Sequence, residues 1–79
     1  MINDDLVRSV TGFAQHHIAT AQDKDRAVNE LLVDVHSMVY ALRDGDTHPT
    51  TIGLATAATW EEIARQVEAL RPSSTPPSV

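Results

Sequence analysis

A chain of 79 residues provides one small domain at most. Its composition, 42% hydrophobic and 22% charged, is typical of a globular protein, and the absence of cysteine excludes disulfides and thiolate metal sites. The formal net charge of -5 argues against nucleic-acid binding, because nonspecific affinity for DNA comes from neutralising phosphates.

The first predicted helix begins after Asn3, a residue that often caps helices, and Asp4 and Asp5 place negative charge at the positive end of the helix dipole. Apolar residues then recur at steps of three and four, the pattern of an amphipathic helix. They are Val7, Val10, Ala14, Ile18 and Ala21, flanked by Leu6 and Phe13. Gly12 weakens this helix by roughly 1 kcal/mol relative to alanine. It either lets another helix approach closely or is a tolerated weakness.

The second predicted helix runs from about Lys24 to Arg43. The preceding AQDKD suits a turn in which Asp23 or Asp25 caps the helix, although one long helix through this stretch is also possible. The apolar residues follow a heptad seam, which two neighbours widen to the stripe of a globular bundle. The seam is Val28, Leu31, Val35, Met38 and Leu42, and the neighbours are Leu32 and Val39.

Val33 and Tyr40 lie on the far side of this second helix, seven residues apart. Solvent-facing positions seldom need a valine and then a tyrosine. The pattern therefore predicts that the helix is covered on both sides. Either another helix of the same chain covers the second side, which we favour, or a partner does.

The segment RDGDTHPTT ends the second helix, because Gly45 suits a left-handed C-cap position and Pro49 follows it. The next stretch, residues 51–59, is ambiguous. Pro49 can occupy the first turn of a short helix over residues 49–58. The threonines and Gly53 equally suit an irregular connection. We predict the short helix.

The last predicted helix starts with a capping box, in which Thr59 and Glu62 bond each other's backbone N–H groups. Its apolar face consists of Trp60, Ile63, Val67 and Leu70. Glu61 and Arg65 are expected to pair on the outside. Pro72 ends the helix.

Together these elements predict an all-α fold, a small bundle of three to four helices. The helical domain occupies residues 1–70, and a disordered Pro/Ser-rich tail follows at residues 71–79 because RPSSTPPSV has little to bury.

The segment ATWEEIARQV, residues 58–67, resembles the first helix of bacterial helix-turn-helix domains of the sigma-region-4 type. The resemblance implies a glycine-containing turn and a recognition helix after it, but EALRPSSTPPSV follows and the recognition helix is missing. A second alignment makes residues 49–58 the supporting helix and 59–70 the recognition helix. That helix presents Glu61 and Glu62 where groove-reading helices carry basic or amide side chains. Nucleic acid is therefore an unfavoured partner.

Motifs for chemistry are weak. Two metal ligands on one helix need a spacing of three or four, and no two of the four histidines have it: His16, His17, His36 and His48. DGDTH, residues 44–48, does not continue as a calcium loop. There is no nucleophile elbow and no glycine-rich phosphate loop. We expect no catalytic residue, metal site or cofactor, although a site assembled between helices stays open.

The sequence favours a small, non-enzymatic protein–protein interaction or regulatory module. A domain this small is marginal alone, so a second copy (a homodimer) or a larger protein is the expected partner. The acidic start MINDDL and the lack of a long apolar run predict a cytoplasmic location without membrane contact. Alternatives are a helix-turn-helix-related transcription regulator and a small metal-dependent enzyme. The candidate interaction residues are Leu32, Val33, His36, Val39, Tyr40 and Trp60, of which Trp60 is an anchor or a core residue.

Overall fold

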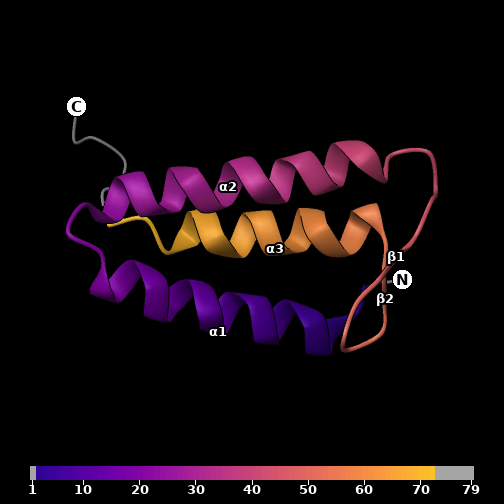
Figure 1. Ribbon diagram of the computed structural model, residues 1–79, viewed down its shortest axis with the longest axis horizontal. Coiled ribbons are helices and arrows are strands. Elements are labelled where there is room, and N and C mark those ends of the chain that lie inside the picture. Colours follow the sequence, from indigo (N-terminus) through magenta and orange to yellow (C-terminus); the bar gives the residue numbers. More distant parts are fainter. Residues whose placement is uncertain (1, 73–79) are drawn as a thin grey trace.

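Three helices make up most of the computed structural model, which describes residues 2–72 (Figure 1). The helices are α1 (Asp4–Thr20), α2 (Lys24–Ala41) and α3 (Ala57–Ala69). Two short strands, β1 (His48–Pro49) and β2 (Leu54–Ala55), pair antiparallel between α2 and α3. The predicted all-α class is confirmed, with this small hairpin as an addition.

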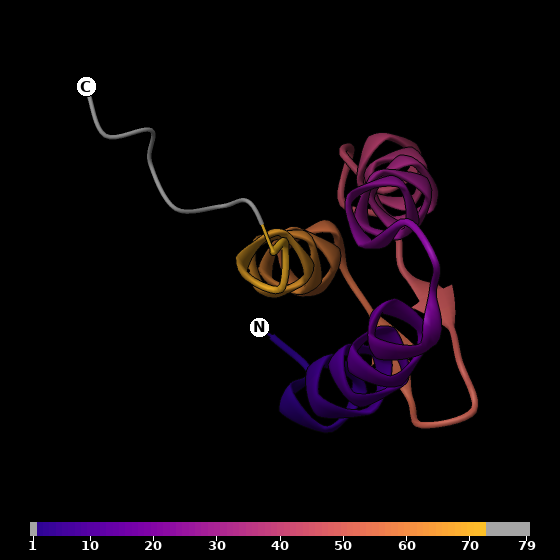
Figure 2. The same ribbon diagram turned by 90° about the vertical axis from the view of Figure 1, so that its left-hand side faces the viewer.

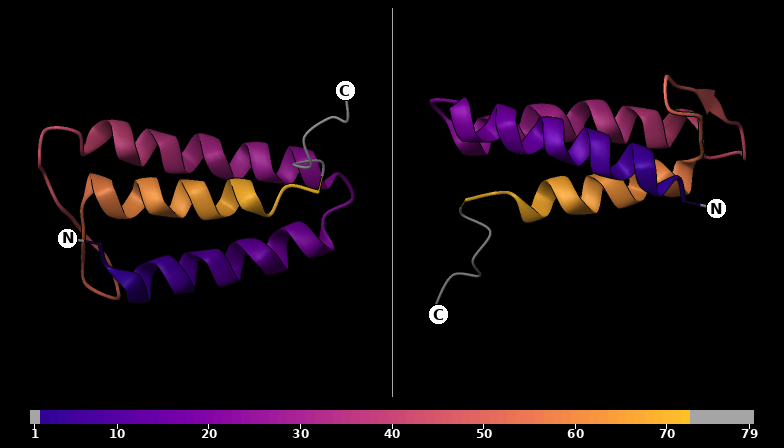
Figure 3. Two further views of the ribbon diagram at one scale, coloured as in Figure 1. Left: turned by 180° about the vertical axis from the view of Figure 1, so that it is seen from behind. Right: turned by 90° about the horizontal axis from the view of Figure 1, so that it is seen from below.

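The three helices pack around a shared core. α2 and α3 lie side by side and run in opposite directions, and α1 packs against both (Figure 1). Viewed end-on, the helices occupy the corners of a triangle (Figure 2). The hairpin lies at the end of the molecule where α1 and α3 begin (Figure 3). Its strand β2 leads into α3, and Leu54 O of β2 accepts a hydrogen bond from Asn3 Nδ2 at 3.2 Å, which ties the hairpin to the start of α1.

The predicted apolar faces form the core. The buried residues from the helices are Leu6, Val7, Ala14 and Ile18 of α1, Ala27, Val28 and Val35 of α2, and Ile63 and Val67 of α3. Ala55 of β2 joins them, and Leu42 is buried just after α2. The predicted faces of all three helices therefore turn toward the core, although Leu31, Met38, Trp60 and Leu70 are only half-buried. Phe13, which was expected beside the face of α1, is 65% exposed.

Two helix starts are capped as predicted. The Asn3 side chain accepts a hydrogen bond from Leu6 N at 3.1 Å, and the Asp23 side chain accepts one from Arg26 N at 3.0 Å. The Asp23 cap separates α2 from α1, so the alternative of one long helix is wrong. Gly45 adopts the predicted left-handed conformation with φ 89°, although α2 itself already ends at Ala41.

The short helix predicted over residues 49–58 is wrong. Thr50 Oγ1 accepts hydrogen bonds from Ile52 N at 3.2 Å and from Gly53 N at 2.9 Å, which closes a tight loop between the strands. Such bonds from a threonine side chain to nearby backbone compete with helix formation. Gly53 has φ 154°, and a Cβ there would lie 3.2 Å from Asn3 Nδ2. The loop thus needs glycine, and the chain cannot continue as a helix.

The capping box predicted for Thr59 and Glu62 is also wrong. α3 begins one turn earlier, and the Thr56 side chain accepts from Thr59 N at 3.5 Å. The buried Thr59 hydroxyl instead accepts from Asn3 N at 3.0 Å, so it joins the starts of α1 and α3. Arg65 pairs with Glu62 and not with Glu61.

The end of α3 is attached to α2. Arg71 Nη2 donates to Glu68 Oε2 at 2.9 Å and to Asn29 Oδ1 at 2.7 Å. The predicted tail therefore begins with a residue that packs against the helices. Residues 73–79, the remainder of that predicted tail, lie outside the described residues.

Gly12 is expected to limit the stability of α1. It is exposed, and no neighbouring atom lies within 4 Å of the position that a Cβ would take, so close helix approach is not its reason. Gly12→Ala should raise the free energy of unfolding by about 0.5–1 kcal/mol, because alanine has less backbone entropy to lose. Urea denaturation measures this. Gly45→Ala is the control and should destabilise, because its φ of 89° is strained for alanine. Equal effects at both positions would contradict the prediction.

Candidate interaction surface

The side of α2 that points away from the core exposes large apolar side chains. Val33 is 66% exposed and Tyr40 is 75% exposed, and the exposed His36 lies between them. We call these three residues the outer face of α2. The prediction that another helix of the same chain covers Val33 and Tyr40 is wrong, because α1 and α3 both pack on the opposite, seam side of the helix.

Leu32 and Val39 connect the outer face of α2 to the core. Both are half-buried, and Leu32 packs against the buried cluster. The apolar surface of α2 therefore continues around the helix from the seam to the outer face. Val33 and Tyr40 are thus large apolar residues on an outward side that is otherwise polar, as in most surface helices.

Trp60 lies on α3, half-buried, and packs against the core cluster. Its Nε1 is buried and has no hydrogen-bond partner within residues 2–72. Of the two roles expected from the sequence, anchor or core residue, the packing favours core. A buried N–H without an acceptor lowers stability, and buried tryptophans usually have a hydrogen-bond acceptor for this group.

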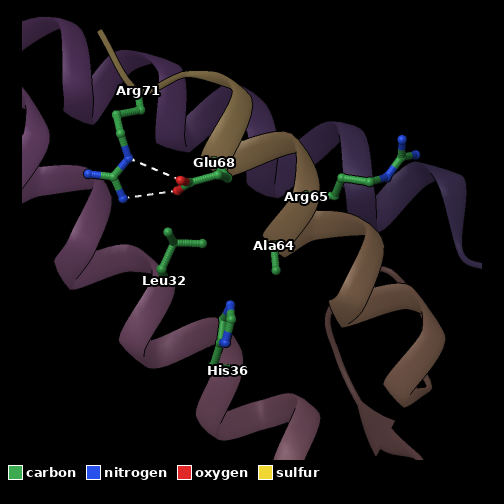
Figure 4. Close-up of a pocket in the computed structure, with 6 residues that line it drawn as sticks. All are labelled: Leu32, His36, Ala64, Arg65, Glu68 and Arg71. Atoms are coloured by element: carbon green, nitrogen blue, oxygen red, sulfur yellow. Dashed lines mark hydrogen bonds and ion pairs between the residues drawn. The ribbon is translucent and has the colours of Figure 1, made fainter. Parts of the chain in front are cut away.

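A shallow groove of about 460 Å³ separates α2 from α3 beside this surface (Figure 4). Leu32 and His36 line it from α2, and Ala64, Arg65, Glu68 and Arg71 line it from the α3 side. Figure 4 shows Leu32 and His36 pointing from α2 toward α3. The α3 residues were not among the predicted site residues, because only the tertiary pairing of the two helices brings them to Leu32 and His36.

A second hollow of about 370 Å³ lies on α2 itself and is lined by Asn29, Leu32, Val33 and His36. It shares Leu32 and His36 with the groove. The hollow and the groove are therefore continuous, and three of the six predicted interaction residues, Leu32, Val33 and His36, line them. Tyr40 lies one turn further along α2 and lines a separate hollow with Arg43 and Asp44.

The charges at the groove pair with one another. A hydrogen bond to Glu68 raises the pKa of Arg71, and Asp25 adds an ion pair at 3.8 Å. The Glu62–Arg65 pair raises the pKa of Arg65 in the same way. A groove with apolar walls and paired charges is suited to bury another protein's side chains.

Glu62 should make stability depend on acid pH. Hydrogen bonds from Arg65 and Gln66 lower the pKa of Glu62 below its ordinary value of 4.5. A lowered folded-state pKa stabilises the fold at pH values above 4.5, and this contribution is lost as pH falls through the folded-state pKa. In Glu62→Gln, stability should therefore fall less steeply below pH 4.5 than in the parent, as measured by urea denaturation at several pH values. Glu61→Gln, at an exposed neighbouring carboxylate, is the control. Parallel pH profiles for the parent and Glu62→Gln would contradict the prediction.

Among residues 2–72 no three histidine, aspartate or glutamate side chains gather in a way that could hold a metal ion. All four histidines are exposed, and His17 stacks on Phe13 with ring centroids 6.2 Å apart. Within the same residues no helix has the length and apolar character needed to cross a membrane.

Comparisons with protein-family models, with curated proteins and with solved structures find no match for this chain. The segment 58–67 that resembles the first helix of a helix-turn-helix lies within α3, and the helix-turn-helix-related regulator stays an untested alternative to the favoured interaction module.

Proposed function

We propose that this protein is a non-enzymatic protein–protein interaction module, a three-helix bundle that binds a protein partner through the outer face of α2 and the adjoining groove. The supporting observation is the exposure of Val33 and Tyr40, 66% and 75%, on a helix whose other side supplies the core. The module acts by occupying or assembling its partner, and a regulatory role fits a domain of this size.

The energetics favour burial of this surface by another protein. Covering apolar area releases roughly 25 cal/mol per Å². Tyrosine supplies a large contact area with few rotatable bonds, and it is enriched among residues that dominate interface energies. The Arg43 guanidinium carbon lies 5.9 Å from the centroid of the Tyr40 ring, a cation–π contact at the edge of the same surface.

The adjoining groove gives this surface a shape. Leu32 and Ala64 provide apolar walls, and the Arg71–Glu68 pair closes one end. A helix or extended segment can lay apolar side chains along such a groove, as in other helix-groove complexes. The paired charges at the rim then favour partners with matching polar groups.

Site-specific photo-crosslinking tests this proposal. A benzophenone amino acid replaces Tyr40 in one variant and Phe13 in a matched control, since both are exposed aromatic residues but Phe13 lies on α1. The variants are irradiated in cells that express them. We expect covalent adducts with protein at Tyr40 and far fewer at Phe13. Equal yields at both positions, or no protein adduct at Tyr40, would overturn the proposal.

A further inference from the structure

A straight stripe of six exposed residues runs along the outward side of α2. Their spacing of 4-3-4-3-4 keeps them on one side of a helix. They are Arg26, Glu30, Val33, Ser37, Tyr40 and Asp44. Asp44 follows the end of α2, but it borders the same hollow as Tyr40 and Arg43, so it continues the stripe. We call these six residues the outer stripe; it contains Val33 and Tyr40 of the outer face.

The outer stripe has a cation at its first position and an anion at its last. Arg26 begins the stripe and is ion-paired at 3.2 Å to the next stripe residue, Glu30; Val33, Ser37 and Tyr40 follow, and Asp44 ends it. The two charged ends are equally distant from position 35. A helix with this pattern is complementary to its own antiparallel copy, because each arginine then meets an aspartate.

From this self-complementarity we infer that the partner of the outer face is a second copy of this chain, bound with the two α2 helices antiparallel about a two-fold axis. This inference rests on the proposed function and names its partner. A two-fold interface uses the same patch on both copies, so each favourable pair occurs twice. A parallel arrangement instead sets Arg26 against Arg26 and Asp44 against Asp44, which costs free energy.

The same antiparallel register is favourable for the remaining pairs. It sets Val33 of one copy against Ser37 of the other, a large side chain against a small one. It sets Tyr40 against Glu30, so the tyrosine hydroxyl can donate to the carboxylate. Glu30 already accepts from Arg26 Nε at 3.2 Å within its own helix, which holds both side chains near the stripe.

Burial of Ser37 at this interface leaves no hydroxyl unpaired. Ser37 Oγ already donates to Val33 O at 2.9 Å in the single chain. The desolvation penalty that a buried serine usually carries is therefore offset within α2. In this register Tyr40 of one copy lies opposite Glu30 of the other. The hollow beside Val33 is within one helical turn of Glu30, so it provides space for the tyrosine ring.

The size of this surface predicts a reversible dimer. The 18 residues of α2 extend over about 27 Å, and a pair of such helix faces buries less than the roughly 1,600 Å² of a standard stable interface. We expect a dissociation constant on the order of micromolar. Monomer and dimer should therefore exchange within an accessible concentration range.

Charge reversal tests the antiparallel register. Sedimentation velocity from micromolar to near-millimolar concentration gives the dissociation constant of the whole chain. Arg26→Asp and Asp44→Arg should each raise it about tenfold, because each creates two like-charge contacts per dimer. The double variant Arg26→Asp/Asp44→Arg should return it close to the parent value. Arg8→Asp, at an exposed arginine of α1 that pairs with Asp5, is the control and should leave it unchanged. Circular dichroism confirms that each variant is folded.

Distinct results overturn the inference. A chain that stays monomeric at every concentration excludes the dimer. If that monomer still forms Tyr40 photo-adducts with a different protein, the proposed function stands and only the second copy is excluded. If it forms none, both fail. A dimer in which the double reversal fails to rescue the single reversals overturns the antiparallel pairing.

Discussion

Replacing Ile63 with alanine is expected to lower the free energy of unfolding by about 2–5 kcal/mol. Ile63 is 0% exposed and lies in the middle of α3, the helix that packs against both α1 and α2. Truncation removes buried apolar surface and leaves a cavity that three packed helices cannot fill. Since domains of this kind are stable by only about 5–15 kcal/mol, this one change removes a large part of the stability.

Urea denaturation followed by circular dichroism measures this loss. Ile52→Ala is the matched control, since Ile52 is 41% exposed in the loop between the strands and should cost under about 1 kcal/mol. Similar losses at the two isoleucines would show that the core is not centred on α3, contrary to the packing described above.

Replacing Thr59 with valine is expected to cost about 1–3 kcal/mol. Valine keeps the shape of threonine but removes the hydroxyl that accepts from Asn3 N at 3.0 Å. The partly buried backbone N–H of Asn3 then has no acceptor. Leaving a donor unsatisfied costs more free energy than the net stabilisation that a hydrogen bond provides. The same hydroxyl lies 3.5 Å from that of Thr56, so the start of α3 is also affected.

Amide hydrogen exchange gives a specific readout for the Thr59→Val variant. The Asn3 amide should exchange faster, together with the first turn of α1, and the thermal midpoint should fall. Thr51→Val, at an exposed threonine, is the control and should change neither. If Thr59→Val retained the exchange rate of Asn3, the hydrogen bond between the two helix starts would not contribute to stability.

Features set by local interactions were predictable from the sequence. Asn3 and Asp23 cap helices through bonds to backbone three residues further on, and apolar residues at steps of three and four form the core faces. Each of these depends on neighbours within one or two turns. The helix over 49–58 was wrong because Thr50 Oγ1 bonds the backbone of Ile52 and Gly53, so the irregular connection that the same residues suited forms instead. The Thr59 cap was wrong because Asn3, distant in the sequence, donates its backbone N–H to the Thr59 hydroxyl. A local pattern contains no sign of that contact.

The candidate site was predictable on α2 but not beyond it. Heptad positions placed Val33 and Tyr40 on one side of the helix, opposite the seam. Whether that side is covered depends on where α1 and α3 pack, and this depends on the tertiary structure and not on the local sequence. For the same reason the sequence did not indicate that Ala64 and Glu68 of α3 would complete a groove with Leu32. The outer stripe, by contrast, combines helix periodicity with charge and is visible once the limits of α2 are known.

The bond between Asn3 and Thr59 also bears on how the chain folds during synthesis. The two residues lie 56 positions apart, so the bond forms only after a long loop has closed, and that closure opposes it entropically. The start of α1 leaves the ribosome before α3 does, but it acquires its hydroxyl partner only when α3 has been made and has docked. Residues made before α2 and α3 therefore acquire one of their hydrogen bonds only after α3 has been made. In a nascent chain that stops before α3, the first turn of α1 should unfold more readily. It is then accessible to proteases and to other unfolded segments.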